Sequence, residues 1–155
     1  MLRYTGDYRL NNKRKIISVS GGFDPIHVGR VRMILEASKY GDVIVIANSD
    51  EWLKRKKGYI FMSYDERQEI LYSIKGVIDV ICADDDDNTV CKTLKKIKPD
   101  IFANGGDRKN NNTPEVNLCN KLGIEMLWNV GGEKMQSSSK LVKNIKNSTQ
   151  KHGDK

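Results

Sequence analysis

The feature that most constrains the fold is an alternation between short apolar runs and longer segments with helical spacing. Five apolar runs have the length and composition of buried strands, and they cover residues 16–20, 43–47, 77–81, 100–104 and 124–128. The intervening and following segments predict helices at residues 28–40, 50–53, 63–74, 89–98, 113–122 and 137–147. Strands separated by helices imply βαβ units and a parallel sheet. We therefore predict an α/β fold, a single doubly wound (Rossmann-like) domain with a five-stranded parallel sheet.

Local signals place several helix ends. Ser63 begins a capping-box pattern, which predicts a helix to about residue 74. Thr113 followed by Pro114 is typical of a cap residue and a first helical position, and Gly123 ends that helix. The segment 50–53 predicts a short helix followed by a basic, lysine-rich loop between residues 54 and 62, which could close over a substrate.

The length of 155 residues suits one compact domain. We place that domain at 15–147, after an N-terminal extension at 1–14 and before a flexible tail at 148–155. No apolar run approaches the roughly 20 residues that a membrane span requires, and the N-terminal segment lacks the apolar core of a secretory signal. Three widely spaced cysteines without a CxxC pair argue against a disulfide framework or zinc site and favour the cytoplasm.

A net charge of +7 raises the hypothesis of a nucleic-acid-binding protein. The excess lysine and arginine gather in short runs and in the C-terminal tail, and few aromatic residues lie among them as stacking platforms. A tail of lysines is usually a solvated surface. We therefore predict neither a nucleic-acid partner nor a membrane partner.

Residues 21–30, with the sequence GGFDPIHVGR, follow the first predicted strand and open the first long helix. Gly21 and Gly22 let the backbone approach a ligand closely. The N-terminus of the helix attracts anions, and His27 in its first turn can reach the same anion. The alternative is a tight turn capped by Asp24 with an incidental histidine.

This string resembles the nucleotidyltransferase superfamily signature G-x-F-D-x-x-H-x-G-H, which it matches at Gly21, Phe23, Asp24, His27 and Gly29. The resemblance implies that the motif binds a nucleoside triphosphate and that His27 contacts the phosphate under attack. Arg30 stands where the superfamily has its second histidine. An arginine can also hold phosphate oxygens. If it misplaces its charge, the chain is instead a nucleotide-binding module with impaired catalysis.

The segment 48–58 resembles the cytidylyltransferase-type branch, in particular the nucleotidyltransferase domain of ADP-heptose synthases. The resemblance implies that Asn48 binds nucleotide and that Lys56 or Lys57 neutralises phosphates; the spacing does not separate these two lysines. It also implies that Arg67 contacts the phosphate of the acceptor. The alternatives are a solvated basic turn and a surface arginine on an amphipathic helix.

Two later segments extend the resemblance. Residues 104–108, NGGDR, are similar to a KGGD segment of the same branch, which implies that Gly105 and Asp107 lie near the base, ribose or acceptor. The serines at 137–139 resemble a second phosphate motif at a helix N-terminus, so Ser137, Ser138 and Ser139 are candidate nucleotide ligands. A glycine-rich turn and a simple helix cap are the alternatives.

The implied activity is transfer of AMP or CMP from ATP or CTP to a phosphorylated small molecule, with release of pyrophosphate. The attacking phosphate is already anionic, so alignment and charge stabilisation suffice. Mg²⁺ is expected to accompany the nucleotide, held largely by phosphate and water, and we predict no metal site made by the protein. The acidic run 84–87 more often caps a helix than binds a metal. The acceptor and the choice of nucleotide stay open; dimers are common among similar proteins.

Overall fold

The computed structural model describes residues 14–105 and 113–131. Its five strands are β1 (Ile16–Gly21), β2 (Asp42–Ala47), β3 (Val77–Cys82), β4 (Ile101–Gly105) and β5 (Glu125–Val130). They form one sheet in the order β3-β2-β1-β4-β5, and every pairing is parallel. The predicted doubly wound fold with a five-stranded parallel sheet is confirmed.

The central strand β1 separates the two halves of the sheet. It pairs along its whole length with β2, from Ile16 to Gly21, and on its other side with β4, where Val19 lies opposite Ala103. The strand order reverses between β1 and β4. In sheets of this kind, ligands bind in the crevice outside the carboxyl ends of the strands at such a reversal. The fold therefore directs attention to the residues that follow β1, β2 and β4.

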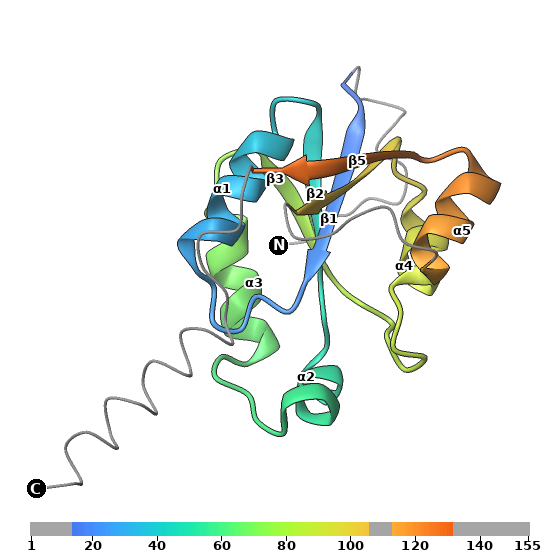
Figure 1. Ribbon diagram of the computed structural model, residues 1–155. Helices are drawn as coiled ribbons and strands as arrows, with labels where there is room; N and C mark the ends of the chain where they lie inside the picture. The colour runs from blue at the N-terminus through green and yellow to red at the C-terminus, as the bar shows by residue number, and fades with distance from the viewer. Residues whose placement is uncertain (1–13, 106–112, 132–155) are drawn as a thin grey trace, which may run out of the picture.

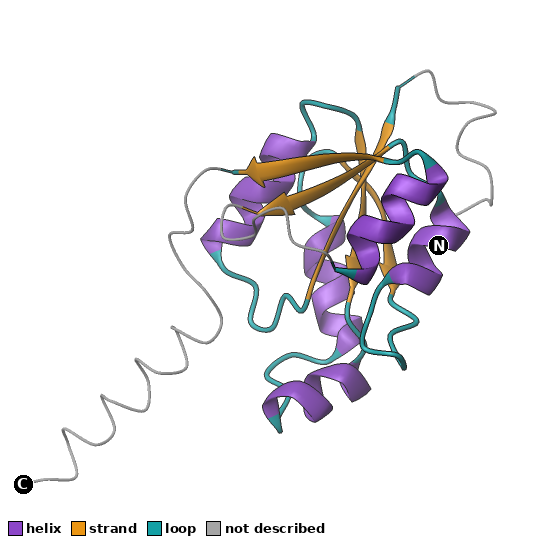
Figure 2. Cartoon of the chain, turned by 45° about the vertical axis from the view of Figure 1, so that its right-hand side comes forward, coloured by secondary structure: helices purple, strands orange, loops and turns teal. Residues whose placement is uncertain are grey.

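Within the described residues, the sheet is accompanied by α1 (Val28–Ala37), α2 (Asp50–Lys57), α3 (Tyr64–Tyr72), α4 (Cys91–Ile97) and α5 (Pro114–Leu122). Figures 1 and 2 show α1 and α3 on one face of the sheet and α4 and α5 on the other. Two buried clusters match this division, one containing Ile34 and Leu71 and the other Leu94 and Leu118. The helix α2 lies apart from both layers (Figure 1).

The helix ends predicted at Ser63, Thr113 and Gly123 are confirmed. The Ser63 side chain accepts a hydrogen bond from the Glu66 amide at the start of α3. Thr113 caps α5 in the same way, Pro114 is its first residue, and Gly123 ends it with a φ of 72°. Only a residue that tolerates a left-handed backbone fits that last position well.

The prediction for the basic run at 54–57 is wrong. These four residues form the last turn of α2 rather than a loop. Ser49 caps the helix by accepting from the Trp52 amide, and Gly58, with a φ of 82°, ends it. Lysine and arginine are good helix formers and are favoured at the negative end of the helix dipole. The connecting loop therefore begins at Gly58, and the lysines lie on the helix.

Among the described residues, no helix has the length and apolar character required to cross a membrane. The predicted last helix at 137–147, the tail at 148–155 and all but residue 14 of the predicted extension lie outside the described residues. Arg14 itself contacts the domain, donating to the Ser38 carbonyl at 2.8 Å and pairing with Asp42 at 3.2 Å.

Candidate functional site

The first motif lies at the carboxyl end of β1, and His27 is the N-cap residue of α1. Its Nδ1 accepts a hydrogen bond from the Gly29 amide at 3.2 Å. In a neutral imidazole, an accepting Nδ1 leaves the proton on Nε2. His27 therefore presents a donor beside the amide groups of a helix N-terminus, which is an arrangement suited to a phosphate oxygen.

Arg30 crosses the end of β1 from the first turn of α1. Its guanidinium carbon lies 5.6 Å from the centroid of the Phe23 ring. A Cβ placed on Gly21 would lie 3.4 Å from that carbon, so the guanidinium is in contact range of the strand end. Stacking on an aromatic face is a favourable position for arginine. The permanent charge of Arg30 therefore lies beside the start of the glycine motif.

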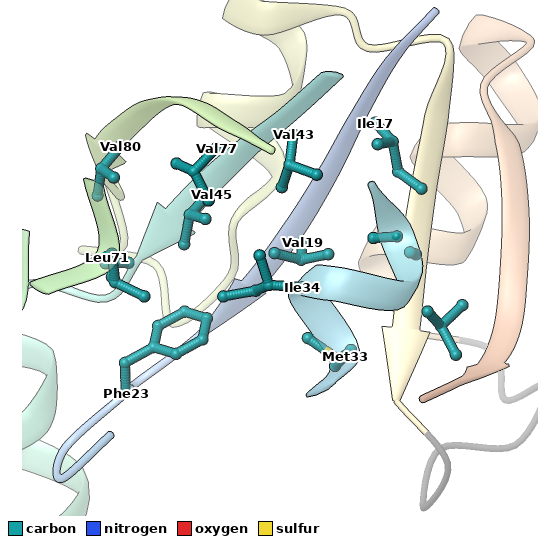
Figure 3. Close-up of a cluster of buried hydrophobic side chains, with 14 of the residues drawn as sticks. Ile17, Val19, Phe23, Met33, Ile34, Val43, Val45, Leu71, Val77 and Val80 are labelled. Carbon is teal, nitrogen blue, oxygen red and sulfur yellow. The ribbon is translucent and has the colours of Figure 1, made fainter. Parts of the chain in front are cut away.

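The Phe23 ring does not fit its predicted nucleotide-binding role. It is 2% exposed and packs in the apolar cluster beneath the motif, near Ile34 and Leu71 (Figure 3). Its backbone has a φ of 53°, a left-handed conformation that costs about 1–3 kcal/mol for such a residue. Phe23 thus anchors the turn in the core.

The carboxylate of Asp24 is also turned inward, which corrects its predicted contact with nucleotide. It is completely buried and accepts hydrogen bonds from the backbone amides of Phe61, at 2.9 Å, and Met62, at 2.6 Å. Two amide donors and a nearby ammonium satisfy the buried charge. Asp24 therefore holds the 58–63 loop against the first motif.

The structure separates the two candidate lysines. The Lys57 ammonium donates to the Asp24 carbonyl at 2.6 Å and lies 3.4 Å from its carboxylate. The Lys56 ammonium lies 4.7 Å from the centroid of the Trp52 ring, and the residue is exposed. Since only the first of these contacts reaches the glycine motif, Lys57 is the lysine placed at the site.

The prediction that Arg67 contacts the acceptor does not fit the geometry, because its side chain is 0% exposed. The guanidinium donates to three backbone carbonyls, at 2.7–3.1 Å, and to the Asp50 carboxylate at 2.8 Å. The carbonyls belong to Gly22, Asn48 and Met62. Arg67 is a structural residue beneath the site that joins the ends of β1 and β2 to the loop before α3.

Asp85 is a buried residue of this region that sequence reasoning missed. Its carboxylate accepts from the Asn48 side chain at 3.0 Å and from the Ser49 amide and hydroxyl at 2.9 and 2.6 Å. Asn48 is 6% exposed and one N–H of its amide is held by Asp85, which argues against its predicted contact with nucleotide. Nothing in a run of four acids marks the second as the buried one.

The neighbours of Asp85 have separate local roles. Asp86 pairs with Lys92 at 2.6 Å, and Asp87 accepts from the Thr89 amide and hydroxyl. The described residues contain no group of three or more histidine, cysteine or acidic side chains that could hold a metal ion. Three carboxylates of the acidic run, those of Asp85, Asp86 and Asp87, are thus engaged in local hydrogen bonds or an ion pair.

The described part of the site thus brings His27, Arg30 and Lys57 to the end of β1. Gly105 ends β4 on the neighbouring strand. Asp107 and the serines at 137–139 lie outside the described residues, so their predicted roles stay predictions. A groove of about 560 Å³ lies between α1 and β5 and is lined by Leu35, Tyr40 and Trp128 among others. None of the predicted site residues that the structure describes lines this groove.

Three comparisons with known proteins show what the chain is similar to. The family model described as cytidylyltransferase-like matches residues 19–145. The chain is 30% identical over 142 residues to the bifunctional protein HldE of Campylobacter concisus. This match covers 90% of this chain but 29% of that protein. It is 35% identical over 94 residues to the FAD synthase of Ferroglobus placidus, covering 61% of this chain and 60% of that protein.

A solved structure is also similar. The lipopolysaccharide core biosynthesis protein of Thermoplasma volcanium has a TM-score of 0.60 and 28% sequence identity, and the match covers 74% of this chain and 93% of that one. The chain therefore spans less than a third of the HldE relative and most of the length of this solved structure.

Proposed function

Since this chain belongs to the cytidylyltransferase-like family, we propose that it transfers AMP or CMP from ATP or CTP to a phosphorylated small molecule and releases pyrophosphate. An oxygen of the acceptor phosphate attacks the α-phosphorus, the bond to pyrophosphate breaks, and that anion leaves. The attacking oxygen is already ionised, so the protein need supply only alignment and charge stabilisation.

The observation that carries the proposal is the grouping of three donors at the end of β1. His27 lies at the N-terminus of α1, Arg30 beside Gly21, and Lys57 against the backbone of Asp24. All three suit phosphate oxygens, and the helix N-terminus adds amide donors and a partial positive charge. We assign His27 and Arg30 to the charge that builds on the phosphates, and Lys57 to the other phosphate oxygens.

Mg²⁺ belongs to the proposal as a companion of the triphosphate. Within the described residues, the carboxylates nearest the site are engaged: Asp24 with the 58–63 loop, Asp50 with Arg67, and Asp85 with Asn48 and Ser49. This donor set does not fit a magnesium site made by the protein. The ion would be held by phosphate oxygens and water, and no step is assigned to it.

The cellular setting and the acceptor extend the proposal. The described structure has its three cysteines free, which supports a reducing compartment such as the cytoplasm. A sugar phosphate or alcohol phosphate suits the resemblance to HldE, and a homodimer is part of the same proposal. Sedimentation of the purified chain would test the dimer.

The test is pyrophosphate release from ATP or CTP with Mg²⁺ and a panel of sugar and alcohol phosphates. The exchange His27→Ala should lower turnover by about 10² or more, since it removes a well-placed donor from the transition state. The only other histidine, His152, supplies the matched control, and His152→Ala should retain full activity. Equal turnover in the two variants would refute the role of His27.

The same assay separates two other hypotheses from this one. One outcome is that the wild-type chain binds nucleotide without releasing pyrophosphate, while Arg30→His restores the release. That result would identify a binding module whose arginine misplaces its charge. A nucleic-acid-binding protein would instead bind DNA or RNA with a steep dependence on salt.

A further inference from the structure

Asn104 is a buried polar residue near the carboxyl end of β4, directly before the last strand residue. It is 6% exposed, and its Nδ2 has no hydrogen-bond partner within residues 14–105 and 113–131. Buried amide groups are nearly always hydrogen-bonded, because an unpaired donor gives up its bonds to water without replacement. An unpaired donor at the ligand-binding end of a sheet points to a ligand.

The position of Asn104 is the point where the sheet reverses its strand order. It follows directly on the pair formed by Val19 of β1 and Ala103 of β4. The glycine motif begins two residues after Val19, at Gly21. Ligands of doubly wound sheets bind in the crevice at this reversal. Asn104 therefore lies on the strand next to the one that carries the first motif.

The other neighbour of Asn104 is irregular. Ala103 pairs with Leu127 of β5 and Gly105 with Val130, so two residues of β5, Trp128 and Asn129, stand against Asn104 alone. Asn129 has a φ of 61°, in the left-handed region. This is a β-bulge, a feature that interrupts the ladder and is common next to active sites. The regular ladder thus ends beside Asn104.

The chemistry of the amide selects the part of the ligand it would bind. The three cationic or donor side chains placed at the end of β1 are His27, Arg30 and Lys57, and they suit the phosphates. A neutral amide brings no charge and matches a neutral acceptor. We propose that Nδ2 of Asn104 donates a hydrogen bond to the nucleoside part, base or ribose, of the bound nucleoside triphosphate. This inference rests on the proposed function.

The test replaces Asn104 with an apolar residue of similar shape, Asn104→Leu. Calorimetry in the presence of Mg²⁺ would compare ATP, CTP and inorganic tripolyphosphate, which lacks the nucleoside. Loss of one neutral hydrogen bond should weaken binding of the preferred nucleotide about two- to tenfold. Binding of tripolyphosphate should change less than about twofold. The melting temperature of the ligand-free variant should be equal or higher, because an unpaired buried donor has been removed.

Ser18 provides a matched control. Its Oγ is likewise buried and has no partner among the described residues, but it lies in the middle of β1, three residues before Gly21. Ser18→Ala should leave binding of all three probes unchanged.

The outcomes separate this inference from the function on which it rests. Equal weakening for tripolyphosphate would place Asn104 on the phosphates and overturn the assignment to the nucleoside. If Asn104→Leu left the nucleotide affinity unchanged, with or without a lower melting temperature, the proposed contact would be overturned. Turnover by the wild-type chain would still support the proposed function. A wild-type chain that binds neither ATP nor CTP would overturn both.

Discussion

Two regions at the carboxyl edge of the sheet, here called corners, carry charged residues that differ in their exposure to solvent. At the N-terminus of α1, His27 and Arg30 are partly exposed. In the corner formed by β2, α2 and the 58–63 loop, the charged groups of Asp24, Arg67 and Asp85 are buried and fully engaged in hydrogen bonds. The first corner can contact a ligand, whereas the second determines where the first corner stands.

The dependence runs through backbone atoms. Arg67 bonds the carbonyl of Gly22 in the motif, and Asp24 bonds the amides of the 58–63 loop. Each buried charge thereby links segments far apart in the sequence. Charged groups in an interior are tolerated only when such partners offset their lost hydration. The comparison predicts that variants of the buried corner lose stability, whereas variants of the exposed corner lose activity.

The largest effect is expected for Arg67→Met. Removing the guanidinium leaves the Asp50 carboxylate and three carbonyls without their donor, so the free energy of unfolding should fall by about 3–5 kcal/mol. Urea unfolding followed by circular dichroism measures this. Arg32→Met, at an exposed position of α1, serves as the control and should change stability by less than about 0.5 kcal/mol. Similar stability in both variants would contradict the structural role of Arg67.

A smaller loss of stability is expected for Asp85→Asn. The exchange keeps the shape but replaces one acceptor with a donor that faces Asn48 and Ser49, so unfolding should become easier by about 1–3 kcal/mol. The adjacent Asp86→Asn should leave the melting temperature unchanged, because that side chain is exposed. A larger loss of stability in Asp86→Asn than in Asp85→Asn would contradict the structural role of the buried Asp85 network.

The pattern of the fold could be predicted from the sequence because local signals agree with burial. Apolar runs mark the strands, Ser63 marks the start of α3, and Thr113 and Gly123 mark the two ends of α5. The extent of α2 does not follow from the charge clustering at 54–57, because a run of basic residues suits a solvated loop as well as a helix. The decisive signals were weaker and lay at its two ends, in the cap of Ser49 and the left-handed Gly58.

The place of a candidate site residue could be predicted only where it follows from a helix N-terminus or a strand end. His27 and Arg30 belong to this class. The burial of Arg67 and Asp24, by contrast, depends on segments 17 to 45 residues away along the chain. Sequence spacing cannot show that these partners meet, and a buried arginine resembles an exposed one until the fold brings carbonyls around it.

A third prediction compares two neighbours on α2. Lys57→Ala should lower kcat/KM about tenfold, since it removes a charge held against the backbone of Asp24 beside the phosphate donors. Lys56→Ala should lower it less than about twofold, because that ammonium lies over Trp52. Steady-state pyrophosphate release gives both values. Greater loss in the Lys56 variant would reverse the assignment.

The smallest effect is expected for Cys119, a buried residue of α5. Burial raises the pKa of the Cys119 thiol from its ordinary value of 9.0 to about 11. Between these values the unfolded chain releases the proton while the folded chain keeps it. Stability is therefore fully present below pH 9 and declines as the pH rises toward 11.

Unfolding free energies at pH 8 and pH 10.5 would measure this decline, and Cys119→Ala should show a shallower one. Burial also raises the pKa of Tyr64, so the wild-type decline has more than one source and the difference between the two proteins isolates Cys119. Identical slopes would contradict the raised pKa of the Cys119 thiol in the folded protein.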